Sequence, residues 1–148
     1  MRTTVSGIED FPDLQGVSAV ISIADPGDEW PAELDGLDVP ILELRFHDAD
    51  GDPRDVEPEE HHLERVRAFL AKQQPDWLHV HCYAGVSRST AIASFALACQ
   101  YPEWTDAQIV EAVRAVRPIA LPNFLLLRQM DRMLSRKLKR AWKTALRY

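Results

Sequence analysis

Cysteine is scarce in this sequence: only Cys82 and Cys99 occur among its 148 residues. Two cysteines do not build a disulfide framework, so we expect a reducing compartment, the cytoplasm. Long apolar runs are also missing, because the most apolar stretch, TAIASFALAC (90–99), falls short of the ~20 residues that a membrane-spanning helix needs. The first residues, MRTTVSGIEDF, lack the apolar segment of a secretory signal peptide. We therefore expect no membrane span.

Basic charge is sparse over most of the chain. Eight of the 17 Lys and Arg residues lie in 128–148 beside a single acidic residue, which leaves nine basic against 22 acidic residues elsewhere. An acidic body argues against nucleic-acid binding, because neutralising phosphates requires a basic surface. Apolar residues at helical spacing run through the basic tail and predict an amphipathic helix at about 123–147. We interpret it as a docked helix with a solvated basic face; a membrane or polyanion site is the alternative.

Repeats and low-complexity segments are absent as well, and 148 residues with 46% hydrophobic content suit a single domain, 1–148. Three β-branched apolar runs, 16–25, 39–46 and 76–82, predict buried strands. A helix is predicted at 59–73, between the second and third runs, and two more follow at 88–101 and 105–116. This order predicts the α/β class: a central, mostly parallel sheet of four to five strands flanked by helices.

The stretch HVHCYAGVSRST (79–90) lies where the third strand should end and the next helix should begin. A glycine-containing turn at this edge directs backbone N–H groups inward, and the helix adds the positive end of its dipole, so we predict an anion site. Arg88 offers paired donors to two phosphate oxygens. The same field stabilises a thiolate on Cys82 and makes it a nucleophile. Taken singly, Cys82 would be explained as a buried core residue and Arg88 as a surface charge. Their spacing directly after a predicted strand favours the anion site instead.

HCYAGVSRST resembles the signature loop of the cysteine-based protein tyrosine phosphatases, in which His-Cys, five residues and Arg precede Ser or Thr. Within that superfamily it is most similar to the dual-specificity-like phosphatases and the compact bacterial tyrosine phosphatases. The resemblance implies that Cys82 forms a phosphocysteine, that Arg88 binds the phosphoryl oxygens and that Ser89 helps the thiolate to leave. It implies no cofactor and no metal. His81 would order the loop from behind. Alternatively, His81 is a buried histidine with no role in the loop, because side chains alternate along a strand and His79 is equally available for that role.

A general acid is needed to protonate the leaving oxygen. The segment RFHDADGDPRDVEPEE follows the second predicted strand, where the resemblance implies the acid aspartate, some thirty residues before the cysteine. We choose Asp48, because it ends the strand directly, as the family's aspartate does. Asp50 is the second choice, and Asp52 and Asp55 follow. The alternative for most of these carboxylates is that they are solvated side chains of an acidic loop with no catalytic role.

The same segment partly matches a calcium loop, since Asp48, Asp50, Asp52 and Glu59 fall on ligand positions. Pro53 occupies the sixth position, which needs glycine for a sharp turn. We therefore predict no metal site.

The loop itself should bind the substrate phosphate, and its residues would be Tyr83, Ala84, Gly85, Val86, Ser87 and Arg88. The first five are uncharged, whereas phosphoinositide-directed relatives carry Lys or Arg there. Tyr83 and Val86 suit an aryl group, so we predict a protein tyrosine phosphatase, with phosphoserine and phosphothreonine as further substrates. The connector RPIALPN (117–123) is either another wall of the site or a plain linker.

Four other functions compete with a phosphoprotein phosphatase: a phosphatase for a non-protein phosphate ester, a rhodanese-like sulfurtransferase, a catalytically silent phosphate-binding module, and a redox sensor. The silent module should lack the nucleophile or the arginine, whereas Cys82 and Arg88 are both present. The redox sensor would pair Cys82 with Cys99, but a helix between them separates the two by about 15–20 Å, and Cys99 suits the core. The expected partners are a phosphorylated protein or peptide, and phosphate or vanadate as a loop ligand. We expect a monomer.

Overall fold

The computed structural model describes all 148 residues and has one four-stranded sheet at its centre. Its strands are β1 (Arg2–Ser6), β2 (Ala19–Ala24), β3 (Ile41–Arg45) and β4 (Trp77–His81), in the spatial order β1-β4-β2-β3. Every neighbouring pair is parallel. The predicted α/β class and its parallel sheet are therefore confirmed. β1 is an addition to the three predicted strands.

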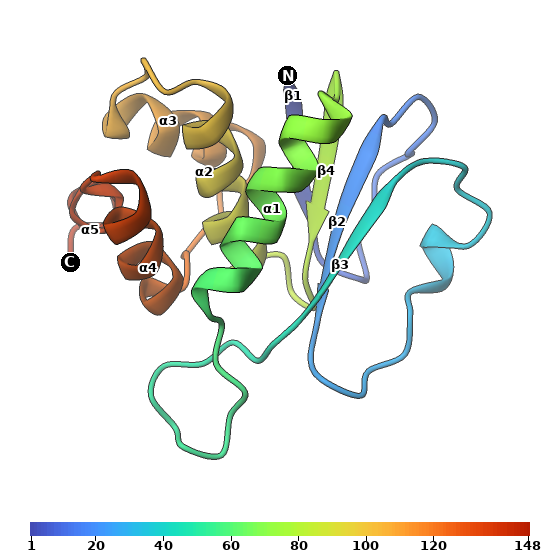
Figure 1. Ribbon diagram of the computed structural model, residues 1–148, viewed down its shortest axis with the longest axis horizontal. Coiled ribbons are helices and arrows are strands. Elements are labelled where there is room, and N and C mark those ends of the chain that lie inside the picture. The colour runs from blue at the N-terminus through green and yellow to red at the C-terminus, as the bar shows by residue number, and fades with distance from the viewer.

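Five α-helices lie on one side of the sheet, and the segment with the 3-10 turn η1 (Ala32–Leu34) lies on the other (Figure 1). Helix α1 (Glu60–Gln73) connects β3 to β4, and α2 (Arg88–Gln100) follows β4. Helix α3 (Asp106–Val116) is capped by Thr105, whose side chain accepts a hydrogen bond from Gln108 N at 3.1 Å. These three helices are confirmed within one residue of their predicted ends.

The predicted single helix at 123–147 is wrong, because the chain forms α4 (Phe124–Leu134) and α5 (Leu138–Leu146). Ser135 adopts a left-handed conformation with φ of 52° and ends α4. The Asp131 carboxylate then accepts hydrogen bonds from Leu138 N at 2.7 Å and Lys139 N at 3.1 Å, which caps the first turn of α5. The apolar stripe continues across the break, since Leu138 is fully buried. None of the helices is long and apolar enough to span a membrane.

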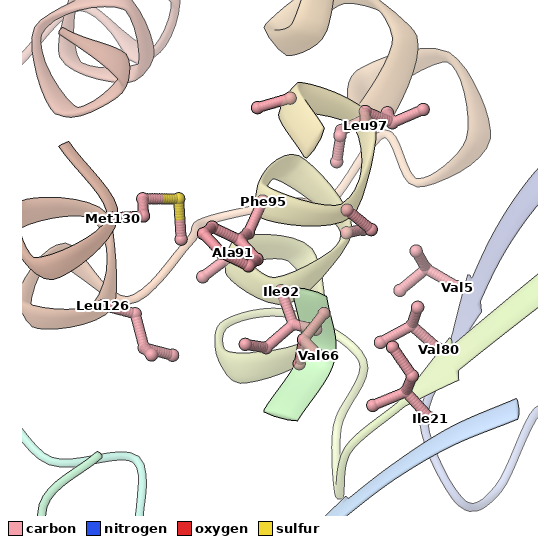
Figure 2. Packing of buried hydrophobic residues seen from close by; sticks show 14 of the residues in the cluster. Val5, Ile21, Val66, Val80, Ala91, Ile92, Phe95, Leu97, Leu126 and Met130 are labelled. Carbon is pink, nitrogen blue, oxygen red and sulfur yellow. The ribbon is translucent and has the colours of Figure 1, made fainter. Parts of the chain in front are cut away.

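Helix α2 crosses the middle of the hydrophobic core and is buried from Arg88 to Ala98. Figure 2 shows Ala91, Ile92 and Phe95 of this helix between the side chains of α4 and those of the sheet. Alanines along α2 let it approach both neighbours closely. The start of the helix, which carries Arg88, is therefore held in place by packing along its whole length.

Alternate residues of each strand face opposite sides of the sheet. Ile21 and Val80 face the helices, whereas Val20 and Trp77 belong to a second cluster beneath the loops around Leu14 and η1. On β4 this alternation directs His79 and His81 away from the helices, and both rings lie near Phe11.

Candidate active site

The 82–88 loop joins the carboxyl end of β4 to the first turn of α2. Cys82 lies at its base and is only 2% exposed. Its Sγ accepts a hydrogen bond from Gly85 N at 3.3 Å and lies 3.1 Å from Ser89 Oγ. An ionised Sγ would therefore have two hydrogen-bond donors, one from the loop backbone and one from the helix.

The backbone carbonyls of the loop point away from Cys82 Sγ, because donors outside the loop hold them. These hydrogen bonds run to Tyr83 O from Ile8 N (2.9 Å), to Ala84 O from Arg117 Nη2 (3.1 Å), to Gly85 O from Arg117 Nε (2.8 Å), to Val86 O from Leu121 N (2.9 Å), and to Ser87 O from Asn123 N (3.2 Å). The donors come from two separate segments of the chain, the N-terminal segment at Ile8 and the 117–123 connector. The loop conformation is thus set by its surroundings as well as by its own sequence.

The backbone N–H groups face the other way. Gly85 N donates to the sulfur, whereas the N–H groups of Tyr83, Ala84, Val86 and Ser87 have no protein acceptor. Together with the amino end of α2 they offer hydrogen-bond donors to an anion beside Cys82 Sγ. The free N–H groups favour the predicted anion site, which stays a prediction.

Glycine is required at two points of this arrangement. Gly85 has φ of 71°, and a Cβ there would lie 2.4 Å from Gly7 N. A Cβ on Gly7 would in turn lie 2.7 Å from Tyr83 O. The N-terminal segment after β1 therefore packs directly against the back of the loop, a contact that sequence analysis missed.

Arg88 is buried, with 5% of its surface exposed. Its Nη1 donates to Asp25 Oδ1 at 2.6 Å and to Phe46 O at 2.8 Å, at the carboxyl ends of β2 and β3. Both bonds use the same nitrogen, so Nε and Nη2 have no protein partner. The guanidinium is thus oriented on one side and free to bind two oxygen atoms on the other. Sequence analysis missed Asp25, which is 63 residues away along the chain.

His81 lies behind the loop, fully buried, with Nδ1 3.2 Å from Cys82 O and Nε2 2.6 Å from Ser22 Oγ. Burial lowers the pKa of His81 below its ordinary value. The ring is therefore neutral at pH 7, with Nδ1 donating to the carbonyl and Nε2 accepting from the serine. His79 contacts Thr4 and Ser6 of β1 instead, and burial lowers its pKa to about 4. Only His81 contacts the loop.

Asp48 and Asp50 are the two acid candidates that line the cavity above Cys82. Asp48 Oδ1 accepts hydrogen bonds from Ser87 Oγ at 2.7 Å and Asn123 Nδ2 at 2.8 Å. Its Oδ2 has no partner in the protein. Asp52 instead forms an exposed ion pair with Arg54 at 2.7 Å, and Asp55 does not line the cavity. The geometry therefore favours Asp48, which is bonded to the loop itself.

The cavity above Cys82 has a volume of about 660 Å³ and is open to solvent on one side. Arg88 is its single cationic residue, and Asp48 and Asp50 are its acidic ones. Leu121, Pro122 and Asn123 form one wall, so the structure brings the end of the 117–123 connector to the site. Phe124 and Tyr148 also line the cavity, and sequence analysis missed both.

Cys99 is separate from this site. It lies near the carboxyl end of α2, whereas Cys82 precedes the amino end, and both thiols are free. Burial raises the pKa of Cys99 to about 11. Distance and low reactivity therefore argue against a redox pair with Cys82.

The chain resembles known phosphatases in sequence and in structure. No protein-family model matches it. It is 47% identical to human dual specificity protein phosphatase 15 over 45 residues, which make up 30% of this chain and 15% of that protein. A crystal structure of DUSP15 is 25% identical, with a TM-score of 0.63, and the match covers 96% of this chain and 90% of that one.

Two further solved structures share the fold. Human DUSP28 is 20% identical with a TM-score of 0.65, over 98% of this chain and 93% of that one. PTPMT1 in complex with PI(5)P is 22% identical with a TM-score of 0.59, over 82% of this chain and 78% of that one. These likenesses support a cysteine-based phosphatase. In its fold and its signature loop, the chain resembles the dual-specificity-like members of the cysteine-based protein tyrosine phosphatase superfamily.

Proposed function

We propose that the protein is a phosphoprotein phosphatase that hydrolyses phosphotyrosine through a phosphocysteine intermediate on Cys82. The observation that carries this proposal is that the loop residues with unpartnered N–H groups, and an Arg88 with two free guanidinium nitrogens, line the same cavity as the buried Cys82. Such preorganised donors stabilise the charge on a transferring phosphoryl group. No metal ion is needed where Arg88 and the amides supply this stabilisation.

In the first step, the Cys82 thiolate attacks phosphorus in line with the leaving oxygen. An S–P bond forms as the P–O bond to the tyrosyl oxygen breaks, and Asp48 Oδ2 gives its proton to that oxygen. Arg88 binds two of the three equatorial phosphoryl oxygens, and the free N–H groups of the loop, those of Tyr83, Ala84, Val86 and Ser87, bind the remaining charge. The tyrosine leaves as a neutral phenol.

In the second step, water attacks the phosphocysteine. Asp48, now a carboxylate, accepts a proton from the water as the O–P bond forms and the S–P bond breaks. The Ser89 hydroxyl, 3.1 Å from Sγ, donates to the sulfur and stabilises the departing thiolate. Inorganic phosphate leaves and the enzyme returns to its starting state.

The walls of the cavity favour an aryl monophosphate. Tyr83, Val86, Leu121 and Phe124 line it with apolar surface that suits a phenyl ring above the phosphate site. Asp48 and Asp50 at the same cavity repel additional phosphate groups, since Arg88 is the only cation there. Phosphoserine and phosphothreonine are the weaker substrates because they leave this apolar surface unfilled. The alternative, a non-protein phosphate ester, is favoured by the likeness to PTPMT1 with PI(5)P.

A comparison of kcat/KM for matched peptides that carry phosphotyrosine or phosphoserine, and for PI(5)P, tests the substrate class. We expect the phosphotyrosine peptide to be preferred by at least about tenfold, a difference of 1.4 kcal/mol in transition-state binding. Preference for PI(5)P would reject the protein substrate and keep the phosphatase. Turnover of thiosulfate without phosphate release would instead establish a sulfurtransferase.

A nucleophilic thiolate keeps its activity only where it stays reduced. We therefore place the protein in the cytoplasm, and we propose that it acts as a monomer, since one chain supplies every group named in the two steps.

A further inference from the structure

Three segments of the chain meet at the carboxylate of Asp48. Asp48 itself follows β3, Ser87 belongs to the 82–88 loop, and Asn123 precedes α4. The Ser87 hydroxyl and the Asn123 amide both donate to the same oxygen, Oδ1, at 2.7 and 2.8 Å. Two bonds to one oxygen fix the plane of the carboxyl group and leave Oδ2 as its unbonded edge.

The orientation of the Asn123 amide is determined by the helix that it caps. Asn123 Oδ1 accepts a hydrogen bond from Leu126 N at 2.9 Å, so the other end of the amide must be the NH₂ group. Nδ2 then donates one hydrogen to Asp48 Oδ1 and the other to Ala49 O at 2.8 Å. The backbone N–H of Asn123 also donates to Ser87 O at 3.2 Å.

Every hydrogen-bonding group of the Asn123 side chain is therefore used, and the residue is 7% exposed. A side chain bonded in this way is rigid. Because it joins the acid residue, the 82–88 loop and α4, it fixes the position of the acid relative to the nucleophile.

We propose that Asn123 is the positioning residue for the general acid, with Ser87 as the second donor. This inference rests on the proposed function, in which Asp48 is the acid. Asn123 does not touch the leaving oxygen; it acts by holding Asp48 Oδ2 where the proton is needed. A displacement of about 1 Å at such a group costs up to ~10²-fold in rate.

The variant Asn123→Ser tests this role. Serine can still cap α4, but its side chain is too short to donate to Asp48. We expect kcat/KM for phenyl phosphate to fall by about 10- to 100-fold. The loss for p-nitrophenyl phosphate should stay within about threefold, because a good leaving group departs without a proton. Equal losses for both substrates would overturn the positioning role.

Asn123→Ala is the matched control for helix capping. It removes the cap as well as the donors, so its Tm should be lower than that of Asn123→Ser by about 2–4 °C. The two variants should nevertheless show the same dependence on the leaving group. If the rate loss follows Tm instead, Asn123 acts through stability and the inference fails.

The double variant Asn123→Ser/Asp48→Asn shows whether the effect passes through Asp48. We expect it to be no slower than Asp48→Asn alone, because the acid is already lost. A further tenfold loss would show that Asn123 acts elsewhere. If Asp48→Asn itself lacks the leaving-group dependence, the acid assignment in the proposed function is at fault. If Asp48→Asn shows it and Asn123→Ser does not, only the positioning role is rejected.

Discussion

Arg117 offers a sharp test of what keeps the proposed phosphate site in shape, because its guanidinium binds the back of the loop. Nε and Nη2 donate to Gly85 O at 2.8 Å and Ala84 O at 3.1 Å, and Nη1 forms an ion pair with Asp10 at 2.5 Å. Asp10 Oδ1 in turn accepts from Gly7 N at 2.8 Å. We expect that without Arg117 the two carbonyls rotate and the neighbouring N–H groups no longer converge on a phosphate.

The variant Arg117→Met keeps the aliphatic stem and removes every donor. Two hydrogen bonds from a charged group are worth about 1.5 kcal/mol each, and the half-exposed ion pair with Asp10 adds at most ~1 kcal/mol. The expected loss of unfolding free energy is therefore about 3–4 kcal/mol, which lowers Tm by roughly 10 °C for a chain of this length. We expect kcat to fall by about 10- to 100-fold, because the loop donors are misdirected.

The ion pair gives this prediction a pH dependence. The hydrogen bond from Arg117 holds the pKa of Asp10 below its ordinary value of 3.8. A lowered carboxyl pKa in the folded state stabilises the fold above about pH 4, and this contribution is lost as the pH falls through the lowered pKa. The difference in Tm between the wild type and Arg117→Met should therefore narrow below about pH 4. It should not vanish, since the bonds to the two carbonyls need only a charged arginine.

Thermal unfolding measures the loss of stability, and kcat together with inhibition by vanadate measures the effect on the loop. Arg114→Met is the control, because Arg114 is exposed on α3 and makes a single long bond of 3.4 Å to Ala145 O. We expect that control to retain its Tm and its affinity for vanadate. If Arg117→Met also retains both, the loop keeps its shape without the arginine and the reasoning is refuted.

Four further substitutions test the proposed chemistry directly. Cys82→Ser should abolish hydrolysis of p-nitrophenyl phosphate yet still bind vanadate or phosphate, and turnover within tenfold of the wild type would reject the nucleophile. Arg88→Lys should lose about 3–4 kcal/mol of transition-state stabilisation, measured as kcat/KM, whereas near-normal rates would mean that the guanidinium does not bind the phosphoryl group. Asp48→Asn should slow a phosphotyrosine peptide by about 10²–10⁴-fold and remove the basic limb of the pH–rate profile, with smaller losses on activated aryl phosphates. Asp50→Asn should be mild, and the reverse ranking would move the acid to Asp50.

The sequence predicts the elements that a local pattern encodes. β2, β3 and β4 are apolar runs with clear ends, and α1 to α3 have helical spacing and start signals. β1 was missed because RTTVS is short and half polar, and its burial depends on pairing with β4, more than 70 residues away. The break between α4 and α5 was missed because the apolar stripe continues through it. What stops the helix there is a set of contacts, including those of Arg136 with Pro102, Trp104 and Asp106.

The candidate site, like the fold, has a part that local sequence predicts and a part that it does not. Cys82, Arg88 and Ser89 share one short motif, so their spacing alone predicts the phosphate loop. The residues that hold this motif come from distant parts of the chain: Asp25 lies 63 residues from Arg88, Asn123 lies 75 from Asp48, and Asp10 lies 107 from Arg117. Such pairs carry no periodicity or spacing that a single sequence displays, and they follow only from the folded chain.

The strand order bears on how the protein acquires its activity as it folds. β4 lies between β1 and β2 and is the last strand in the chain, so β2 and β3 can pair early, whereas β1 has no neighbour until residues 77–81 have been made. The donors at Arg117 and Asn123 follow later still. Parallel pairing over such separations is slow, because the entropy of closing long loops must be overcome first. A chain that stops before about residue 123 would therefore contain Cys82 but lack these donors. It would also lack the buried residues that α4 and α5 add to the core, so we expect it to have no competent loop.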